Sequence, residues 1–347
     1  MGDEIHQLLA RHYGLTFTAG DVRPLPSYDD LNFDVAGVYV LKLNLTEDVE
    51  RLMFESSAMQ FLAKSGLSAL VAKVVPVVEA GKDTAFNVNV EYKGKQYFMR
   101  LLTYIKGEVI AKCEQSTDLL HSWGKCLGQL DLAFSSWKDF PSIAKKEHAW
   151  DLKNSVAVYP WIEDVEVIGR KSKLRDAFAF FLRYQKLLKE DTQVRSQVVH
   201  NDGNDYNVLV LNDEISGIID FGDTVHTKLV YNVAIAAFYA ALGKDDVSRA
   251  FDGAVCLIAG YCSAMPLNKT ERVFLFPCML GRLSHSISSS AHRRKLEPDN
   301  AYISITEEVA WKFLEQICSS FESLDAAKVE FDRRMMSPVV IHREGSE

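Results

Sequence analysis

Acidic and amide residues with a spacing suited to phosphate chemistry gather between residues 200 and 223. Residues 200–207 read HNDGNDYN, and residues 220–223 read DFGD after an apolar run. Phosphoryl transfer to a hydroxyl requires a carboxylate that accepts the hydroxyl proton and oxygen ligands that hold magnesium on the phosphates. The spacing therefore predicts Asp202 as the catalytic base and Asn207 and Asp220 as ligands of Mg²⁺.

A simple turn is the competing interpretation of residues 200–207, because Asn, Asp and Gly are the commonest turn residues. Taken alone, the segment favours that interpretation. It weakens because H-x-D-x-x-x-x-N, an apolar strand and D-F-G follow one another in this order, in the strand context that the motif requires. The combination indicates a catalytic loop.

A lysine and a glutamate in the first hundred residues provide independent support. Lys42 lies in the middle of the alternating strand predicted over residues 38–45. Glu55 shares an apolar face of the helix predicted over residues 47–64. Buried charges require a partner, so the two predict an ion pair that directs the lysine to the nucleotide phosphates. Glu50 is an alternative partner, and an edge strand with a solvated helix flank is the alternative to any pair.

The first part of the chain contains no glycine-rich G-x-G-x-x-G loop. Residues 26–33 read PSYDDLNF and would have to cover the phosphates with backbone N–H groups and with Ser27, next to Tyr28. The same string also fits a hairpin turn.

The pattern of expected secondary structure changes near residue 105. Before it the pattern is strand-like with one helix, and after it the pattern is helical except for a short β segment between Gln197 and Phe221. No Pro- or Ser-rich linker separates the two parts. We predict a nucleotide-binding lobe over residues 1–102 and a lobe with the catalytic loop and acceptor site over residues 103–347, joined by a hinge at about 103–107.

Composition excludes several classes of function. The 347 residues are 48% apolar, carry a formal net charge of −8 and contain no long basic run, which argues against nucleic acid as a partner. The six cysteines form no C-x-x-C pair, which favours a reducing compartment. The N-terminus lacks the features of a signal peptide, and the longest apolar stretch is too short to span a membrane. We expect a cytoplasmic protein without a membrane partner, whose oligomeric state the sequence leaves open.

Several strings resemble the aminoglycoside phosphotransferase and choline kinase superfamily, and within it the hydroxylysine kinase subgroup. They are residues 25–33 (LPSYDDLNF), 39–42 (YVLK), 100–104 (RLLTY), the catalytic segment and 296–300 (LEPDN). The resemblance implies an α+β, protein-kinase-like bilobal fold and transfer of a γ-phosphate to a hydroxyl of a small amine-bearing molecule. For the subgroup it implies GTP as the donor and 5-hydroxy-L-lysine as the acceptor, and ATP stays open. Carried over by position, Leu102, Thr103 and Tyr104 border the purine site.

Two positions depart from the aminoglycoside branch, which usually has Gly and Asp where this chain has Asn201 and Asn232. Neither departure removes a catalytic group. A kinase for ethanolamine, homoserine or an aminoglycoside would share every catalytic residue, and a non-catalytic nucleotide-binding module is the alternative from another class.

Acceptor recognition is expected in the second lobe. A polar stripe at helical spacing and a Trp-Asp pair are the candidates, with a solvated helix face as the competing explanation of the stripe. The acceptor candidates are Trp150, Asp151, Asp223, Arg282 and His285, and the stripe continues through Ser286, Ser289 and Arg293.

Overall fold

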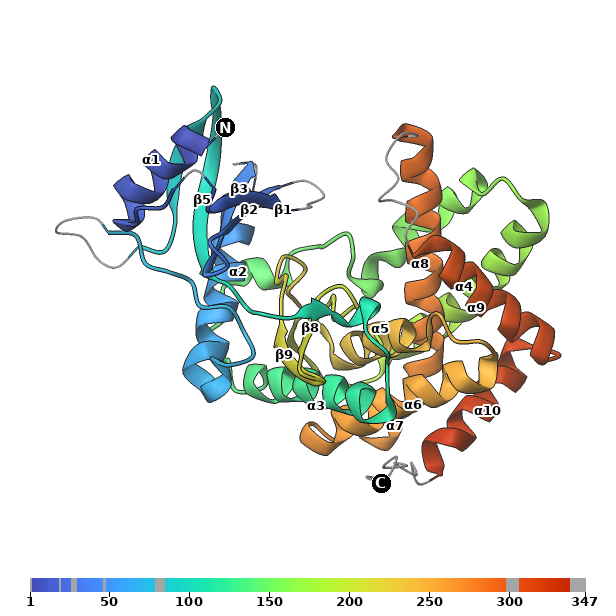
Figure 1. The fold of residues 1–347 in the computed structure, drawn as a ribbon. Coiled ribbons are helices and arrows are strands. Elements are labelled where there is room, and N and C mark those ends of the chain that lie inside the picture. Colours follow the sequence, from blue (N-terminus) through green and yellow to red (C-terminus); the bar gives the residue numbers. More distant parts are fainter. Residues whose placement is uncertain are drawn as a thin grey trace. The chain divides into compact units, whose positions relative to one another are not determined.

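The computed structural model describes residues 2–18, 20–25, 30–45, 48–78, 85–297 and 306–337. The chain forms two compact units (Figure 1). The first contains Met1–Val109, Pro141–Ala144 and Leu209–Gly222, and the second contains Ile110–Phe140, Lys145–Val208 and Asp223–Glu347. Each unit therefore combines segments that are distant in the sequence. The mixture of a strand-rich and a mostly helical part confirms the predicted α+β class.

An antiparallel five-stranded sheet in the order β1-β2-β3-β5-β4 forms most of the first unit. Its strands are β1 (Val22–Leu25), β2 (Leu31–Val35), β3 (Tyr39–Leu45), β4 (Val88–Tyr92) and β5 (Lys95–Thr103). In β3, Leu41 and Leu43 point into a core that helix α1 (Gly2–Tyr13) completes with Ile5 and Leu9. Because side chains alternate along a strand, Lys42 faces the other side. It is paired in register with Arg100 of β5.

Helix α2 (Val49–Leu62) follows β3 and begins at Asp48, whose side chain accepts a hydrogen bond from the backbone N–H of Arg51. The helix continues into a π-turn, Ala63–Leu67, in which Gly66 takes a positive φ of 88°. The predicted helix and strand therefore form nearly as expected, and they place Glu55 and Lys42 in the same unit.

Two tight turns join neighbouring strands of the first unit. Lys93 and Gly94 both have positive φ values, as a type I′ turn requires, and they join β4 to β5. Asn212 and Asp213 do the same between β8 (Val208–Leu211) and β9 (Glu214–Ile218). Strands β8 and β9 form a three-stranded sheet with β6 (Glu108–Val109), in the order β6-β8-β9.

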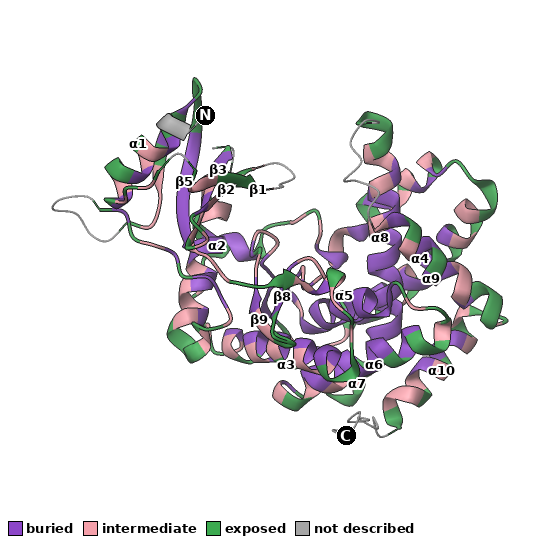
Figure 2. Cartoon of the chain, in the orientation of Figure 1, coloured by how far each residue is buried: buried purple, intermediate pink, exposed green. Residues whose placement is uncertain are grey.

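The second unit is a helical body with one small sheet. Its longer helices are α3 (Thr117–Phe134), α4 (Ile168–Glu190), α5 (Leu229–Ala241), α6 (Val247–Ala264), α8 (Leu275–Leu296), α9 (Glu307–Ser320) and α10 (Leu324–Met336). Every residue of α5 is buried, which Figure 2 shows as a continuous purple helix. Helix α5 packs against α6 and α8, and α3 packs against α6. The sheet pairs β7 (Ser196–Val199) with β10 (Val225–Lys228).

Two consecutive helices follow residue 268. Helix α7 (Lys269–Val273) begins with a capping box between Asn268 and Glu271, and α8 begins after Phe274. A 3₁₀ segment, Leu152–Asp164, has no counterpart in the sequence-based expectation. Within the described ranges, no helix is both long and apolar enough to cross a membrane.

Candidate functional site

The loop after β7 fixes the carboxylate of Asp202 with three donors. Its Oδ2 accepts hydrogen bonds of 2.8 Å from the side-chain amides of Asn204 and Asn207. Its Oδ1 accepts one of 2.7 Å from Nη2 of Arg282. The loop is therefore organised around this carboxylate, because an ionised carboxylate has enough lone pairs to accept all three hydrogen bonds.

Asn207 holds the loop in shape and leaves one atom available. Its Nδ2 donates to both the backbone oxygen and the carboxylate of Asp202, at 2.9 Å and 2.8 Å. The amide oxygen takes no part in these two bonds, and it is a hard oxygen ligand of the kind that Mg²⁺ prefers. Asn204 closes the turn, because its Oδ1 accepts from the backbone N–H groups of Tyr206 and Asn207. Asn204 was not predicted as a site residue, although Asn is typical of such turns.

Asn201 and Asn232 form one buried arrangement. Asn201 has a φ of 66°, in the left-handed region that favours Gly and that Asn tolerates better than most residues. Its backbone N–H donates to Oδ1 of Asn232, and Nδ2 of Asn232 donates to Oδ2 of Asp131. Tyr261 also donates to that oxygen. Both departures from the family pattern therefore preserve the shape of the loop. Burial raises the pKa of Asp131 to about 7.

Arg282 on α8 is buried beside the loop. Its side chain is 5% exposed, and its guanidinium carbon lies 4.8 Å from the ring centroid of Trp150 and 5.5 Å from that of Tyr239. Nη2 also donates to the hydroxyl of Tyr239. The structure thus brings Arg282 and Trp150 together with Asp202. The solvated-face explanation of the stripe is wrong here, because Arg282, His285 and Ser289 are all buried.

His285 lies one helical turn after Arg282 and stacks on Trp150 with ring centroids 4.8 Å apart. Its Nδ1 is 3.1 Å from the hydroxyl of Ser155. Burial, together with the charge of Arg282 and the neighbouring His148, lowers the pKa of His285 to about 3. The imidazole is therefore neutral near pH 7 and adds no charge to this site.

The two remaining acceptor candidates have other contacts. Oδ1 of Asp223 lies 3.6 Å from Nε2 of His148. Asp151 is fully buried, accepts from the hydroxyl of Thr227 at 2.8 Å and pairs with Lys153 at 3.0 Å. Asp151 also caps the 3₁₀ segment that follows it. Its charge is therefore already balanced within the second unit.

In the first unit, Glu55 is the centre of a buried three-residue cluster. Its Oε1 lies 3.7 Å from Nζ of Lys42, and its Oε2 lies 2.8 Å from Nη2 of Arg100. Burial alone would raise the pKa of Glu55, but Arg100 and Lys42 outweigh it and lower that pKa. Burial acts to lower the pKa of Lys42, and the carboxylates of Glu55 and Asp220 outweigh it and raise that pKa. Lys42 and Glu55 are thus both charged at neutral pH.

Arg100 was missed as a site residue. Its side chain is fully buried and also donates to Oδ1 of Asn44 at 3.0 Å and to the backbone oxygen of Leu52 at 3.2 Å. An arginine within the apolar run 97–102 was the available signal, since a buried guanidinium requires acidic or carbonyl partners. Arg100 holds Glu55 in place and leaves Lys42 as the more exposed cation.

The other candidates of the first unit lie at strand ends. Asp220 follows β9, is exposed and has a φ of 61°. Thr103 ends β5 and accepts a hydrogen bond from the backbone N–H of Lys73 through Oγ1. Leu102 is buried, and the backbone N–H of Tyr104 donates to Val38. Ser27 and Tyr28 lie outside the described residues.

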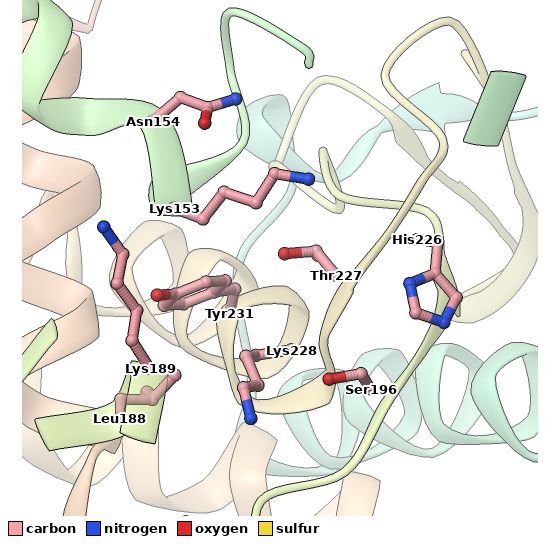
Figure 3. A pocket seen from close by; sticks show the side chains of 9 residues that line it. All are labelled: Lys153, Asn154, Leu188, Lys189, Ser196, His226, Thr227, Lys228 and Tyr231. Carbon is pink, nitrogen blue, oxygen red and sulfur yellow. The ribbon is translucent and has the colours of Figure 1, made fainter. Parts of the chain in front are cut away.

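A cavity of about 430 Å³ lies in the second unit, and none of its lining residues belongs to the loop 200–207 (Figure 3). Three of its lining side chains are lysines. Lys228 donates to the backbone oxygens of Asp191 and Val194, and Lys153 pairs with Asp151. Figure 3 shows the amino groups of Lys153, Lys189 and Lys228 pointing in different directions. They do not converge on a common point.

Comparison with known proteins gives a consistent result. The model of the phosphotransferase enzyme family matches residues 21–265. Hydroxylysine kinase of Mus musculus is 28% identical over 333 residues, covering 87% of this chain and 85% of the mouse protein. The Danio rerio protein of the same name is 28% identical, with 90% of each chain covered.

Solved structures share the fold. A microcompartment-associated aminopropanol kinase has a TM-score of 0.67 at 16% identity and covers 91% of this chain and 97% of its own. An amicoumacin kinase in complex with AMP-PNP, Ca²⁺ and Ami has a TM-score of 0.66 at 15% identity, and the match covers 90% of this chain and 92% of that structure's chain.

Proposed function

The chain belongs to the phosphotransferase enzyme family, and from this premise we propose that it transfers the γ-phosphate of GTP or ATP to a hydroxyl of 5-hydroxy-L-lysine or a similar small amine-bearing acceptor. The single observation that carries the proposal is the carboxylate of Asp202, oriented by Asn204, Asn207 and Arg282. Support for the acceptor class comes from the relatives named hydroxylysine kinase.

In the proposed reaction, Asp202 accepts the proton of the acceptor hydroxyl. The oxygen of that hydroxyl forms a bond to the γ-phosphorus, and the bond between the γ-phosphorus and the leaving nucleoside diphosphate breaks. Asn207 keeps Asp202 in position by donating to it twice. Lys42, held by Glu55, contacts the nucleotide phosphates, and Leu102, Thr103 and Tyr104 border the purine. Ser27 and Tyr28 are assigned to the phosphate-covering loop by the sequence alone.

A divalent metal fits the donor set. The amide oxygen of Asn207 and the carboxylate of Asp220 are hard oxygen ligands, and Mg²⁺ takes few protein ligands beside phosphate and water. When bound, Mg²⁺ neutralises negative charge on the transferring phosphate. We assign Asn207 and Asp220 as the residues that would hold it. The division into lobes 1–102 and 103–347, with a hinge at 103–107, stays a prediction.

Turnover by the purified protein tests the proposal. Release of nucleoside diphosphate is measured with Mg²⁺ and either GTP or ATP, against 5-hydroxylysine, ethanolamine, homoserine and an aminoglycoside. We expect release with 5-hydroxylysine and an Asp202→Asn rate about 10²–10⁴-fold lower, the usual contribution of a general base.

Asp213→Asn is the matched control, because Asp213 lies in an exposed turn with a φ of 61° that Asn also adopts. It should retain the wild-type rate. Full activity in Asp202→Asn would refute the assigned base. Absence of release with every acceptor would favour a non-catalytic nucleotide-binding module.

A further inference from the structure

Arg282 is a buried cation with unused donors. Among the residues that the structure describes, its Nε and Nη1 atoms have no hydrogen-bond partner, although both are buried. Nη2 alone is engaged, by Asp202 and Tyr239. A buried donor without an acceptor is costly, and buried groups in folded proteins are nearly always paired. The free donors therefore indicate a ligand that supplies acceptor atoms.

The surroundings of Arg282 limit what this ligand can be. The guanidinium lies against Trp150 and Tyr239, which fix its plane. His285 also stacks on Trp150 and is neutral near pH 7, so it adds no second charge beside Arg282. The free N–H groups of Nε and Nη1 lie on different edges of the guanidinium, so a carboxylate would accept one charge-assisted hydrogen bond from one of them.

The location of Arg282 connects this ligand to the reaction. The same guanidinium contacts Asp202, the proposed base, at 2.7 Å. An anion held by one of its remaining donors would therefore lie within a few ångströms of the base, at the distance of two groups of one small molecule. Asp223 also contributes to the electrostatic field at Arg282. A molecule with a carboxylate and an ammonium group would match both charges.

We propose that Arg282 binds the carboxylate of the acceptor, so that the enzyme selects hydroxy amino acids over amino alcohols that lack a carboxylate. This inference rests on the proposed function, and it adds the residue that determines the acceptor class. Arg282 then has two contacts with separate roles: it orients Asp202 through Nη2, and it anchors the acceptor through one of its other donors.

The first test changes the acceptor and leaves the protein intact. Binding of 5-hydroxy-L-lysine and of its carboxamide is measured by calorimetry, in the presence of a non-hydrolysable nucleotide and Mg²⁺, and turnover of both is measured in parallel. We expect the carboxamide to bind about 100-fold more weakly, the effect of losing a charge-assisted hydrogen bond in a buried site. Equal binding of the two compounds would overturn the proposal.

The second test changes Arg282. In Arg282→Gln the preference for the acid over the carboxamide should fall from about 100-fold to nearly one, and Arg282→Lys should retain part of it because the charge remains. Arg175→Gln is the control, since Arg175 forms an exposed pair with Glu163. It should keep the full preference. If Arg282→Gln slows both acceptors equally and leaves the ratio unchanged, Arg282 only positions Asp202 and the proposal fails.

The outcomes for the two proposals are separable. Acid-selective binding without turnover would support the anchor and contradict the proposed kinase activity. Turnover without selectivity would support the kinase activity and contradict the anchor. Neither binding nor turnover would contradict both.

Discussion

The backbone N–H of Asn201 donates a 2.9 Å hydrogen bond to the side chain of Asn232, although 31 positions separate the two residues. Asn232 in turn donates to Asp131, so an amide links the catalytic loop to a buried carboxylate of α3. An amide is required at position 232 because one neighbour is a donor and the other is an acceptor.

Asn232→Asp should therefore destabilise the protein. The new carboxylate would lie against Asp131 without a donor between them, and like charges in a buried site disfavour ionisation of both. We expect the free energy of unfolding to fall by about 2–4 kcal/mol, measured by urea denaturation. In the double variant Asp131→Asn with Asn232→Asp, the amide and the carboxylate exchange places, so the new amide at position 131 can donate to the new carboxylate at position 232. This variant should recover most of the loss. An additive double variant would contradict this account.

Asp131 predicts a pH dependence of stability. Burial raises its pKa in the folded state to about 7, above the ordinary value of 3.8, so the folded state holds this proton more tightly than the unfolded state. Its contribution is favourable at low pH and is lost as the pH rises from about 4 to 7, by about 4 kcal/mol at 1.36 kcal/mol per pKa unit. Asp131→Asn lacks this titration.

The measurement is the difference in unfolding free energy between Asp131→Asn and the wild type, at several pH values from 4.5 to 8. Subtraction removes the contribution of other titrating groups. As the pH rises to about 7, the unfolding free energy of the wild type should fall relative to that of Asp131→Asn. Above that pH the difference should stay constant. A flat difference across this range would show that Asp131 ionises normally in the folded protein.

Arg100 should be more important for stability than any exposed cation of its strand. Arg100→Met leaves Glu55 buried with Lys42 at 3.7 Å as its remaining ion-pair partner among the described residues. Removing one member of a buried pair costs about 3–5 kcal/mol. Lys95→Met, at the exposed start of β5, is the control and should change stability by less than about 0.5 kcal/mol. Similar losses in both variants, in urea unfolding, would contradict a special role for Arg100.

Close contact between α3 and α6 depends on glycine. A Cβ atom on Gly124 would collide with the backbone oxygen of Leu257, and one on Gly260 would collide with that of His121. Because backbone atoms cannot move aside cheaply, Gly124→Ala and Gly260→Ala should each lose about 3 kcal/mol or more.

Gly169 in α4 is the control for both glycines, since nothing lies within 4 Å of its Cβ position. Gly169→Ala should be neutral or stabilising by up to about 1 kcal/mol, because Ala favours helix. Thermal unfolding followed by circular dichroism measures all three. A neutral Gly124→Ala would show that the two helices separate readily.

The sequence by itself predicted the elements whose patterns are local. The strand predicted over residues 38–45 forms at Tyr39–Leu45, and the helix predicted over residues 47–64 forms at Val49–Leu62, since apolar periodicity and flanking turn residues define them. The family was also readable, because the motif of the predicted catalytic segment is contiguous within about 20 residues. Strand β10 was not predicted, since Val225–Lys228 is short and is stabilised by its pairing with β7.

Only the tertiary structure decided the partners of the buried charges. Glu55 was expected to pair with Lys42, but Arg100, 45 positions later in the chain, lies closer to it. Arg282 was one residue of a stripe that equally fitted a solvated face, and folding buried it against Trp150 and Asp202. Periodicity shows which side chains share a face, but the packing of distant elements determines what that face contacts.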